Sequence, residues 1–419
     1  MAGSNAVTST AQEPDTEPET ARAASAPEAP SSVVASPSSA VAPQAEAVID
    51  LDAVAHNIRI LNEHAGDASV MAVVKADAYS HGAVPVARAA LAAGARELGV
   101  ATLEEGLELK HAGITAPVLS WLHTSDADYA PAITAGVELG LSSPRHLAAV
   151  VDAARRVGET ATVSVKIETG LNRNGVSHEE WDDFLVDLAR AEAERAIRVK
   201  GMFSHLAHAD EPHHPVIDDQ CERFTRALDD AKHAGLVPEA AHMANSAATL
   251  TRTDLRFEMV RPGIAIYGLS PVPRMGTFDL RPVMTFRSRV ALVKKVAAGE
   301  GVSYGHTWIA PHDTIVALLP VGYADGIPRA LSGRFDVWLG DDRRPGIGRV
   351  SMDQVVVDLG PDGAGVREGD IAVFFGNGER GVPHAQEWAE ALDTIHYEVV
   401  TSVRGRTVRT FVGGPDGPS

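Results

Sequence analysis

The first half of the chain, from about residue 45 to 268, alternates between short apolar runs and longer amphipathic segments. The longer segments place apolar residues at helical spacing, and several end in Ala-Gly, a signal for the end of a helix. They predict helices over 83–94, 145–158, 178–193 and 217–235. The apolar runs predict eight strands, over 69–76, 97–103, 117–122, 137–143, 162–169, 198–207, 240–247 and 258–268.

Strands that alternate with helices favour an α/β fold with a parallel sheet. Eight such units are the number that closes a (β/α)8 barrel, and we expect this barrel over residues 45–280. An open, doubly wound sheet is the alternative, because counting strands does not by itself exclude it.

The pattern changes after about residue 280. The segments 283–296, 313–324, 334–340 and 353–359 resemble strands, are separated by Gly, Pro and Asp, and show little helical period. They predict a second, mostly antiparallel β domain over 281–412, followed by a frayed end over 413–419.

Residues 1–44 differ from everything that follows. Ala, Ser and Pro make up 25 of these 44 residues, and the segment contains no Leu, Ile or aromatic residue. Such a segment buries too little apolar surface to offset the entropy lost on ordering, so we expect a disordered tail.

Charge and cysteine content narrow the functional classes. The 419 residues carry a formal net charge of -19, which argues against nucleic acid or an anionic membrane surface as the main partner. The single cysteine, Cys221, cannot close an internal disulfide or build a structural zinc site. No apolar run is long enough to span a bilayer and no secretory signal is readable, so we expect a cytoplasmic enzyme.

Three motifs suggest chemistry that we do not assign. The segment 376–381 fits GxGxxG, but little chain follows it and Asn377-Gly378 is typical of a hairpin turn. The segment 208–215 contains several His, Asp and Glu, yet its prolines indicate a solvated loop, and we predict no metal site. Cys221 lies in a helical period with no base indicated beside it, so we expect a structural role.

Lys75 stands at the end of the first predicted barrel strand, in the segment MAVVKADAYSHG. A lysine there is most often an ordinary surface residue, but active sites of barrels form at these strand ends, and a desolvated lysine can form a Schiff base. The segments ANSAA and RPGIAIYG, at strands seven and eight, offer the small residues and backbone N–H groups of a phosphate site. Together these features suggest pyridoxal phosphate.

The chain resembles alanine racemase, a family of fold-type III pyridoxal-phosphate enzymes, from about residue 46 to about 410. The resemblance rests on blocks that occur in the order of the family, namely AVVKADAYSHG, VKIETGLNRNG, FSHLAHADE, MANSAA, MVRPGIAIYGL, VSYGHTW, VGYADG, GRVSMDQ and IHYEV. It implies interconversion of L- and D-alanine, which supplies D-alanine for peptidoglycan, by a homodimer with shared active sites.

The resemblance also implies roles for individual residues. Lys75 would bind the cofactor covalently and act as one base, and Tyr304 of the other subunit would be the opposite base. Arg261 would contact the pyridine nitrogen, His205 the ring face and Arg173 the ring hydroxyl and the substrate. The phosphate would be held by Tyr79, Ser246, Gly263, Ile264 and Tyr397, and Asn245 would also bind the cofactor.

The remaining implied residues lie at the substrate entrance. Met352, Asp353 and Tyr323 would line it, with the backbone N–H of Met352 facing the substrate carboxylate. Lys166 aligns with a lysine that is carbamylated in many members. The arginines of SVRGRTVRT do not align clearly, and we assign them no role.

Two other functional classes remain open at this point. A broad-specificity racemase or an amino-acid decarboxylase would keep the fold, although the decarboxylases normally carry a glycine triplet and a catalytic cysteine, and Ser351 stands in SMDQ here. A non-catalytic cofactor carrier would normally consist of the barrel alone, and the second domain argues against it.

Overall fold

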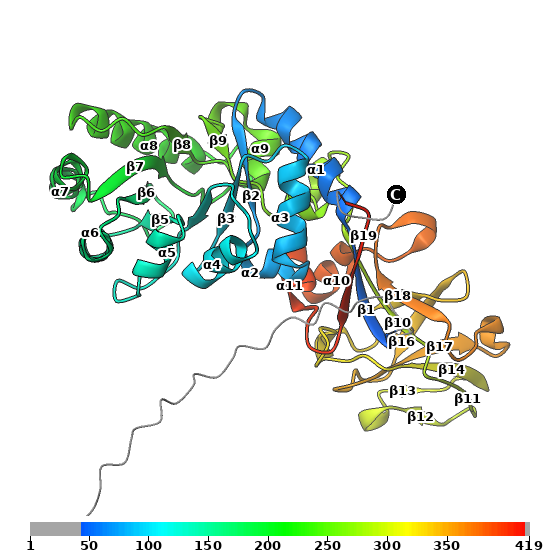
Figure 1. Ribbon diagram of the computed structural model, residues 1–419. Coiled ribbons are helices and arrows are strands. Elements are labelled where there is room, and N and C mark those ends of the chain that lie inside the picture. Colours follow the sequence, from blue (N-terminus) through cyan, green and yellow to red (C-terminus); the bar gives the residue numbers. More distant parts are fainter. Residues whose placement is uncertain (1–42, 415–419) are drawn as a thin grey trace, which may run out of the picture. The chain divides into compact units, whose positions relative to one another are not determined.

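The computed structural model describes residues 43–414 (Figure 1). The tail predicted over 1–44 and the frayed end predicted over 413–419 lie almost wholly outside this range, so both stay predictions. Within the described range, no helix combines the length and the apolar character needed to cross a membrane.

A closed barrel of parallel strands forms the first part of the fold, as the sequence predicts, and the alternative of an open sheet is excluded (Figure 1). Each of the eight predicted runs contributes one strand. The strands are β2 (Ser69–Val73), β3 (Glu97–Val100), β4 (Val118–Ser120), β5 (Glu138–Leu141), β6 (Ala161–Lys166), β7 (Ile197–Phe203), β8 (Ala240–His242) and β9 (Met259–Val260).

Helices connect successive barrel strands, and all four of the helices predicted from periodicity are present. The helices of this part are α1 (Leu51–Ala65), α2 (Lys75–Ser80), α3 (Ala83–Ala92), α4 (Leu103–His111), α5 (Ala130–Thr134), α6 (Pro144–Val157), α7 (Trp181–Ala193), α8 (Val216–His233) and α9 (Ser246–Thr251).

The last two barrel strands are shorter than predicted. The run 240–247 is a strand only as far as His242, because Asn245 caps the helix α9 and its side chain accepts a hydrogen bond from the Ala248 N–H. The run 258–268 leaves the sheet after Val260 and ends in a 3-10 turn over Ile264–Tyr267. Both departures place polar and small residues at the carboxyl end of the barrel.

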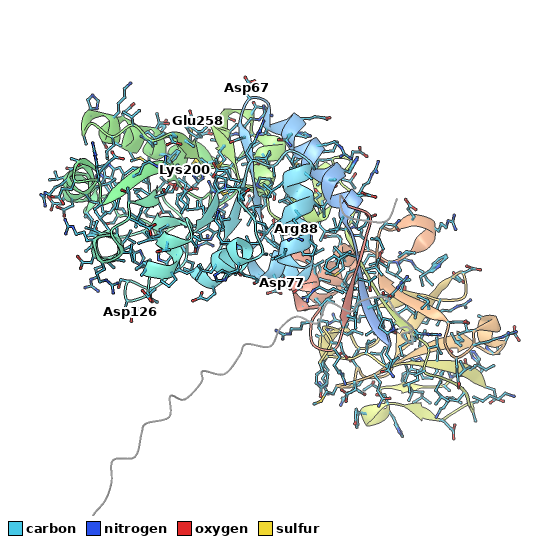
Figure 2. The ribbon with its side chains drawn as sticks, in the orientation of Figure 1. Asp67, Asp77, Arg88, Asp126, Lys200 and Glu258 are labelled. Atoms are coloured by element: carbon cyan, nitrogen blue, oxygen red, sulfur yellow. The ribbon has the colours of Figure 1, made fainter. Side chains whose placement is uncertain are left out.

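The barrel interior holds a buried ion cluster as well as apolar side chains. The Lys200 ammonium on β7 lies 2.5 Å from Glu97 Oε2 and 2.8 Å from Glu138 Oε2, and Glu138 also accepts a hydrogen bond from Ser164 (Figure 2 labels Lys200). Burial opposes the ammonium form, but the two carboxylates outweigh it and raise the pKa of Lys200. Glu97, Glu138 and Lys200 therefore tie β3, β5 and β7 together.

The second part of the fold is a nine-stranded, mostly antiparallel sheet, which confirms the predicted β domain. Its strands, in sheet order, are β11 (Leu292–Val296), β14 (Thr314–Leu319), β17 (Val355–Gly360), β16 (Arg343–Ile347), β15 (Asp336–Trp338), β18 (Ile371–Phe375), β10 (Met284–Arg289), β1 (Ala45–Asp50) and β19 (Val408–Val412). A separate pair consists of β12 (Gly301–Val302) and β13 (Trp308–Ile309).

The first described strand belongs to this second sheet and not to the barrel. Residues 45–50 form β1, which pairs antiparallel with β10 and parallel with β19, whereas the sequence assigned them to the barrel range 45–280. Alternating apolar residues fit either sheet, and only the pairing partners, which are distant in sequence, decide between them.

The sequence analysis did not predict two helices of the second part, α10 (Ala385–Leu392) and α11 (His396–Ser402). A capping box between His384 and Glu387 starts α10, but histidine is not among the residues that signal a helix N-cap in a sequence, so this start was not readable. The helix α11 is short, and it carries Tyr397 toward the barrel.

Candidate active site

A cavity of about 260 Å³ lies where the barrel strands end. It brings together eleven residues that the sequence analysis selected, from segments spread over more than 300 positions. These residues are Lys75, Tyr79, Lys166, Arg173, His205, Asn245, Ser246, Arg261, Gly263, Ile264 and Tyr397.

The backbone that follows Lys75 has an unusual conformation. The four residues from Ala76 to Tyr79 all have φ between 51° and 55°, and Ser80 continues with φ 65°. Each non-glycine residue in this left-handed region costs about 1–2 kcal/mol, so the surrounding structure must hold the turn. We call residues 76–80 the left-handed turn; it directs both Lys75 and Tyr79 into the cavity.

Glu105 holds the start of this turn. Its carboxylate accepts hydrogen bonds from the backbone N–H of Ala76, at 2.6 Å, and of Ala101, at 2.7 Å. Burial and the nearby Arg173 lower the pKa of Lys75, while the negative charge of Glu105 opposes this shift. The site therefore favours a larger fraction of neutral amine at Lys75 than a lysine in water would have.

Arg261 is held rigidly beside the cavity. It donates from Nη1 to Nδ1 and to the carbonyl of His242, at 2.8 and 2.7 Å, and from Nη2 to the Ser204 carbonyl at 2.6 Å. Burial lowers the pKa of Arg261 to about 9, so the guanidinium keeps its proton at neutral pH. Its Nε makes no hydrogen bond to any residue of 43–414 and remains free to donate to a ligand.

The cavity has a strongly positive character in an otherwise acidic chain. Lys75, Lys166, Arg173 and Arg261 line it, and no described lining residue is acidic. Burial and these cations lower the pKa of His205 well below its usual value, so its imidazole is neutral. The cavity is therefore suited to an anionic ligand.

Lys166 lies within this group of cations and donates a hydrogen bond to Asn174 Oδ1. Burial, together with Arg173 and Arg261, lowers the pKa of Lys166 to about 8. A lysine with this pKa has a larger neutral fraction near neutral pH than an ordinary lysine, and the neutral amine is the form that reacts with carbon dioxide.

Hydroxyl and backbone groups gather at one side of the cavity. Ser246 Oγ accepts from the Gly263 N–H at 2.8 Å and from the Ala265 N–H at 3.3 Å, so its own proton is free to be donated. The hydroxyls of Tyr79 and Tyr397 make no hydrogen bond to another residue in the described part of the chain. A Cβ at Gly263 would collide with the Tyr79 hydroxyl, so only glycine at this position leaves room for the hydroxyl.

Four predicted site residues lie outside this cavity. Tyr304 is 70% exposed, Met352 52% and Tyr323 43%, and the Asp353 carboxylate pairs with Arg406 at 2.7 Å. Backbone hydrogen bonds join Tyr323 to Ser351, and Ala324 to Met352, so the entrance residues lie together on the β domain. One chain does not bring them into the barrel cavity.

The sequence analysis missed several residues that shape the site. Trp121 and Phe203 line the cavity, and His242 positions Arg261 while its ring stacks on Phe203, with centroids 5.2 Å apart. A signal was available, because Trp121 directly follows β4 and Phe203 and His242 end β7 and β8, where barrel sites form.

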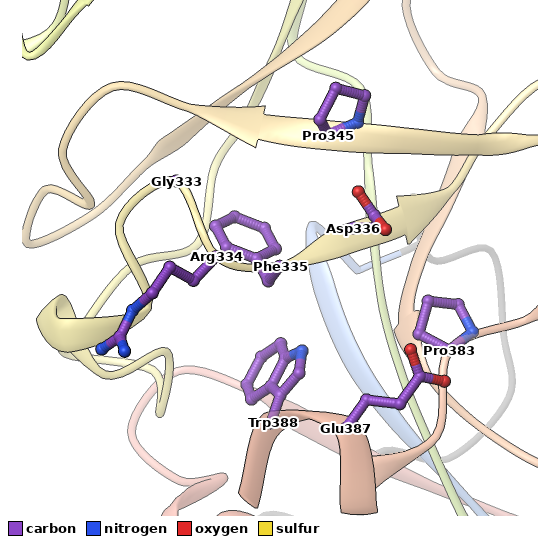
Figure 3. Close-up of a pocket in the computed structure, with 8 residues that line it drawn as sticks. All are labelled: Gly333, Arg334, Phe335, Asp336, Pro345, Pro383, Glu387 and Trp388. Carbon is purple, nitrogen blue, oxygen red and sulfur yellow. The ribbon is translucent and has the colours of Figure 1, made fainter. Parts of the chain in front are cut away.

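The GxGxxG segment 376–381 is a loop between β18 and α10, with Gly378 in a left-handed conformation (φ 77°). Because β18 pairs antiparallel with β10 and β15, the loop does not belong to the parallel βαβ unit that a dinucleotide-binding turn needs. It is also not a hairpin, because a helix and not a strand follows it directly. A cavity of about 330 Å³ lies near this loop and contains no predicted site residue (Figure 3). Two of its charged side chains are bound internally: Glu387 pairs with Arg343, and Arg334 donates to the Ala330 and Ala391 carbonyls.

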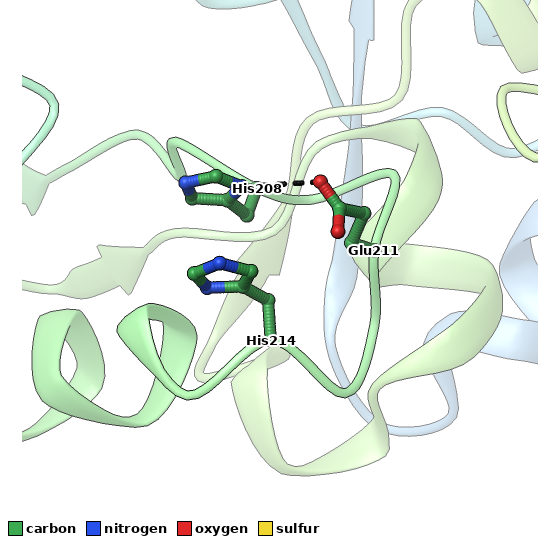
Figure 4. A group of neighbouring side chains, drawn as sticks. All are labelled: His208, Glu211 and His214. Atoms are coloured by element: carbon green, nitrogen blue, oxygen red, sulfur yellow. Dashed lines mark hydrogen bonds and ion pairs between the residues drawn. The ribbon is translucent and has the colours of Figure 1, made fainter.

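In the loop 208–215, His208, Glu211 and His214 place one ligand atom each within 4.8 Å of one another (Figure 4). The two rings stack with centroids 3.7 Å apart, and His214 Nδ1 accepts the Val216 N–H, which leaves the proton of a neutral ring on Nε2. Neither feature suits metal ligation. Cys221 lies on α8, half-buried, and burial raises the pKa of its thiol.

Comparison with known proteins identifies the family. The family model described as "Alanine racemase, N-terminal domain" matches residues 49–271, and "Alanine racemase, C-terminal domain" matches residues 283–411. The alanine racemase of Mycobacterium ulcerans is 59% identical over 367 residues, which cover 88% of this chain and 95% of that protein. That of Mycobacterium tuberculosis is 56% identical, covering 88% of this chain and 96% of the relative.

Solved structures agree with these relatives. The alanine racemase from Streptomyces lavendulae, a producer of D-cycloserine, has a TM-score of 0.87 and 46% identity, covering 90% of this chain and 98% of that one. The enzyme from Corynebacterium glutamicum has a TM-score of 0.78 and 44% identity, covering 88% of this chain and 100% of that one. This chain therefore belongs to the alanine racemase family.

Proposed function

We propose that this isomerase interconverts L- and D-alanine with pyridoxal 5'-phosphate, using Lys75 and Tyr304 as two bases. The observation that carries the proposal is the cavity itself, where the half-buried Lys75, with its lowered pKa, stands among three further cations and a set of free hydroxyls. The proposed product D-alanine would feed peptidoglycan synthesis, and the cytoplasmic location stays a prediction.

The residues present fit this cofactor. Tyr79, Ser246 and Tyr397 offer hydroxyls, and Gly263 and Ile264 a closely approached backbone, for a phosphate. Arg261 would donate from Nε to the ring nitrogen without giving up its proton, and His205 would lie against the ring. When bound through Lys75, the cofactor acidifies the Cα proton of the amino acid by drawing electrons away from that carbon.

Racemisation requires a proton to leave one face of Cα and another to arrive on the opposite face. Lys75 Nζ would exchange the proton on one face and Tyr304 Oη on the other, so the substrate need not turn over. Arg173 would bind the substrate and orient the cofactor, and Trp121 and Phe203 would exclude water from the reacting atoms.

A homodimer would complete the site. Tyr304, Tyr323, Met352 and Asp353 lie on the exposed surface of the β domain, away from the chain's own cavity. We propose that a second copy inserts these residues at the entrance of the cavity, with the Met352 N–H facing the substrate carboxylate. Each of the two equivalent sites would then combine the barrel cavity of one subunit with the β-domain residues of the other.

The test uses purified full-length protein with added pyridoxal phosphate. Circular dichroism should show L-alanine losing its rotation, and borohydride followed by peptide mapping should place the trapped cofactor on Lys75. The same optical signal with serine and with arginine as substrate measures substrate breadth. Release of carbon dioxide measures decarboxylation. Trapping at another lysine, or an unchanged rotation of L-alanine, would contradict the proposal.

A further inference from the structure

The C-terminal segment of the chain contacts the left-handed turn from several sides. From α11, the Thr401 carbonyl accepts a hydrogen bond from Ser80 Oγ at 3.0 Å. From β19, Arg409 Nε donates to the Ser80 carbonyl at 2.7 Å, and its Nη2 lies 3.0 Å from Asp77 Oδ2. Figure 2 labels Asp77 at this turn.

Close packing accompanies these polar contacts. A Cβ at Gly82 would lie only 2.8 Å from the ring of Phe411, so β19 lies directly against the end of the turn. The other oxygen of Asp77, Oδ1, accepts the Ala83 N–H at 2.8 Å and so ties the turn to α3. Arg409 thus donates to two groups of a strained segment that starts beside Lys75 and contains Tyr79.

We propose that Arg409 is a positioning residue, which holds the left-handed turn in the conformation that places Lys75 and Tyr79 in the cavity. A run of left-handed, non-glycine residues relaxes unless its surroundings fix it, and Arg409 supplies two charge-assisted contacts from a strand more than 300 residues away in sequence. The consequence for the cofactor rests on the proposed function, in which Lys75 binds it.

The test replaces Arg409 by methionine, which keeps the length of the side chain and removes its donors. We expect the amides of 76–83 to exchange hydrogen about tenfold faster in the apoprotein, since charged hydrogen bonds that stabilise the closed turn are lost. We also expect pyridoxal phosphate to dissociate about tenfold faster, and the change in its visible absorbance measures this rate.

Arg287→Met is the matched control. Arg287 pairs with Glu46 on the same sheet, with 37% of its side chain exposed against 30% for Arg409, and it does not touch the turn. The proposal is overturned if Arg409→Met and Arg287→Met give the same exchange at 76–83 and the same cofactor dissociation.

Asp77→Asn covers the case in which Arg409→Met does not fold. It removes the charge facing Arg409 and keeps an oxygen for the Ala83 N–H, so we expect exchange at 76–83 to rise about threefold. An unchanged exchange rate would contradict the proposal. If the wild-type protein binds no pyridoxal phosphate, the proposed function fails, while the exchange comparison in apoprotein still tests Arg409.

Discussion

At the scale of single residues, the charge of the side chains that line the cavity is opposite in sign to the net charge of the chain. The chain carries a net charge of -19, yet four cations line the cavity and no described carboxylate does. Desolvation and mutual repulsion lower the pKa of Lys75, Lys166 and His205. The cavity therefore attracts anions, and its lysines and its histidine lose their protons more readily than they would in water.

Lys166 gives the first prediction at this scale. A neutral amine can take up carbon dioxide and release a proton to form a carbamate, and the lowered pKa of about 8 makes this form available near neutral pH. The carbamate would place a negative charge beside Arg173, which the group of cations favours. Solution NMR with 13C-labelled bicarbonate should show the adduct in wild type and not in Lys166→Ala.

The pH dependence of this adduct follows from the direction of the shift. As pH falls from 8 to 6, Lys166 becomes protonated and the carbamate signal should decrease. A signal that persists unchanged at low pH, or survives in Lys166→Ala, would rule out this assignment.

Tyr304→Phe tests the second base. Loss of one hydroxyl should lower kcat/KM for alanine by about a hundredfold or more, the usual worth of a general acid–base group. Stability should change by less than about 0.5 kcal/mol, because 70% of the side chain is exposed in the single chain. Racemisation rates in both directions measure the loss of activity, and thermal unfolding measures the change in stability. A kcat/KM near that of wild type would refute the role of Tyr304 as the second base.

At the scale of elements, the residues proposed for the chemistry lie at the ends of the barrel strands, and the opposite part of the barrel holds a structural ion cluster. Lys75, Lys166, Phe203 and Arg261 lie at or just after strand ends, whereas Glu97 and Glu138 stand at strand beginnings. Lys200 joins these two carboxylates inside the barrel. The two groups of charges therefore serve different purposes in one barrel.

Lys200→Met should destabilise the fold by about 3–5 kcal/mol, since it leaves two buried carboxylates without their cation. Burial already raises the pKa of Glu97, so in the variant this carboxyl takes up a proton as pH falls toward 5, and the deficit should shrink. Urea unfolding at pH 8 and pH 5 measures both effects.

Lys110→Met is the control for this prediction, because Lys110 donates only to the Ala116 carbonyl in the described structure. In wild type, the raised pKa of Lys200 means that its contribution is present below about pH 10.5 and is lost as pH rises through the higher folded value. Equal losses in the two variants at both pH values would contradict the cluster's role.

At the scale of the whole molecule, the site is divided between surfaces that one chain does not join. The barrel cavity holds the residues proposed to bind the cofactor, and the exposed face of the β domain holds the proposed entrance residues and second base, Tyr304, Tyr323, Met352 and Asp353. The proposed assembly of two chains would account for both observations, and it would make catalysis depend on association.

Mixing two inactive variants tests this arrangement. Lys75→Ala and Tyr304→Phe should each be nearly inactive alone, but a mixed dimer has one intact site built from Lys75 of one chain and Tyr304 of the other. Random reassortment makes half the dimers mixed with one of two sites intact, so activity should recover to about a quarter of wild type.

The recovery should disappear if the two variants are mixed without dissociating the dimers first. Recovery by neither procedure, in proteins shown to be dimeric by light scattering, would mean that Lys75 and Tyr304 act within the same chain. Gel filtration of each variant confirms that the substitutions leave association intact.

The sequence by itself predicted the barrel and the β domain from local patterns, and its resemblance to the alanine racemase family implied eleven of the residues that line the cavity. Strand and helix periods are local, and blocks such as AVVKADAYSHG and MVRPGIAIYGL keep their chemistry and order within a few positions. Local patterns also explain the errors, because β8 and β9 end shortly before Asn245 and Gly263, the N-caps of the helical turns that follow, and apolar composition does not register such caps.

Only the tertiary structure decided the rest. β1 pairs with β10 and β19, which are far away in the sequence, and Arg409 contacts the left-handed turn across a similar separation. The hydrogen bond between Arg261 and His242 depends on side-chain geometry. Hydrogen bonds and ion pairs act over a few ångströms in space, so their partners are fixed by how the chain folds and not by its local pattern.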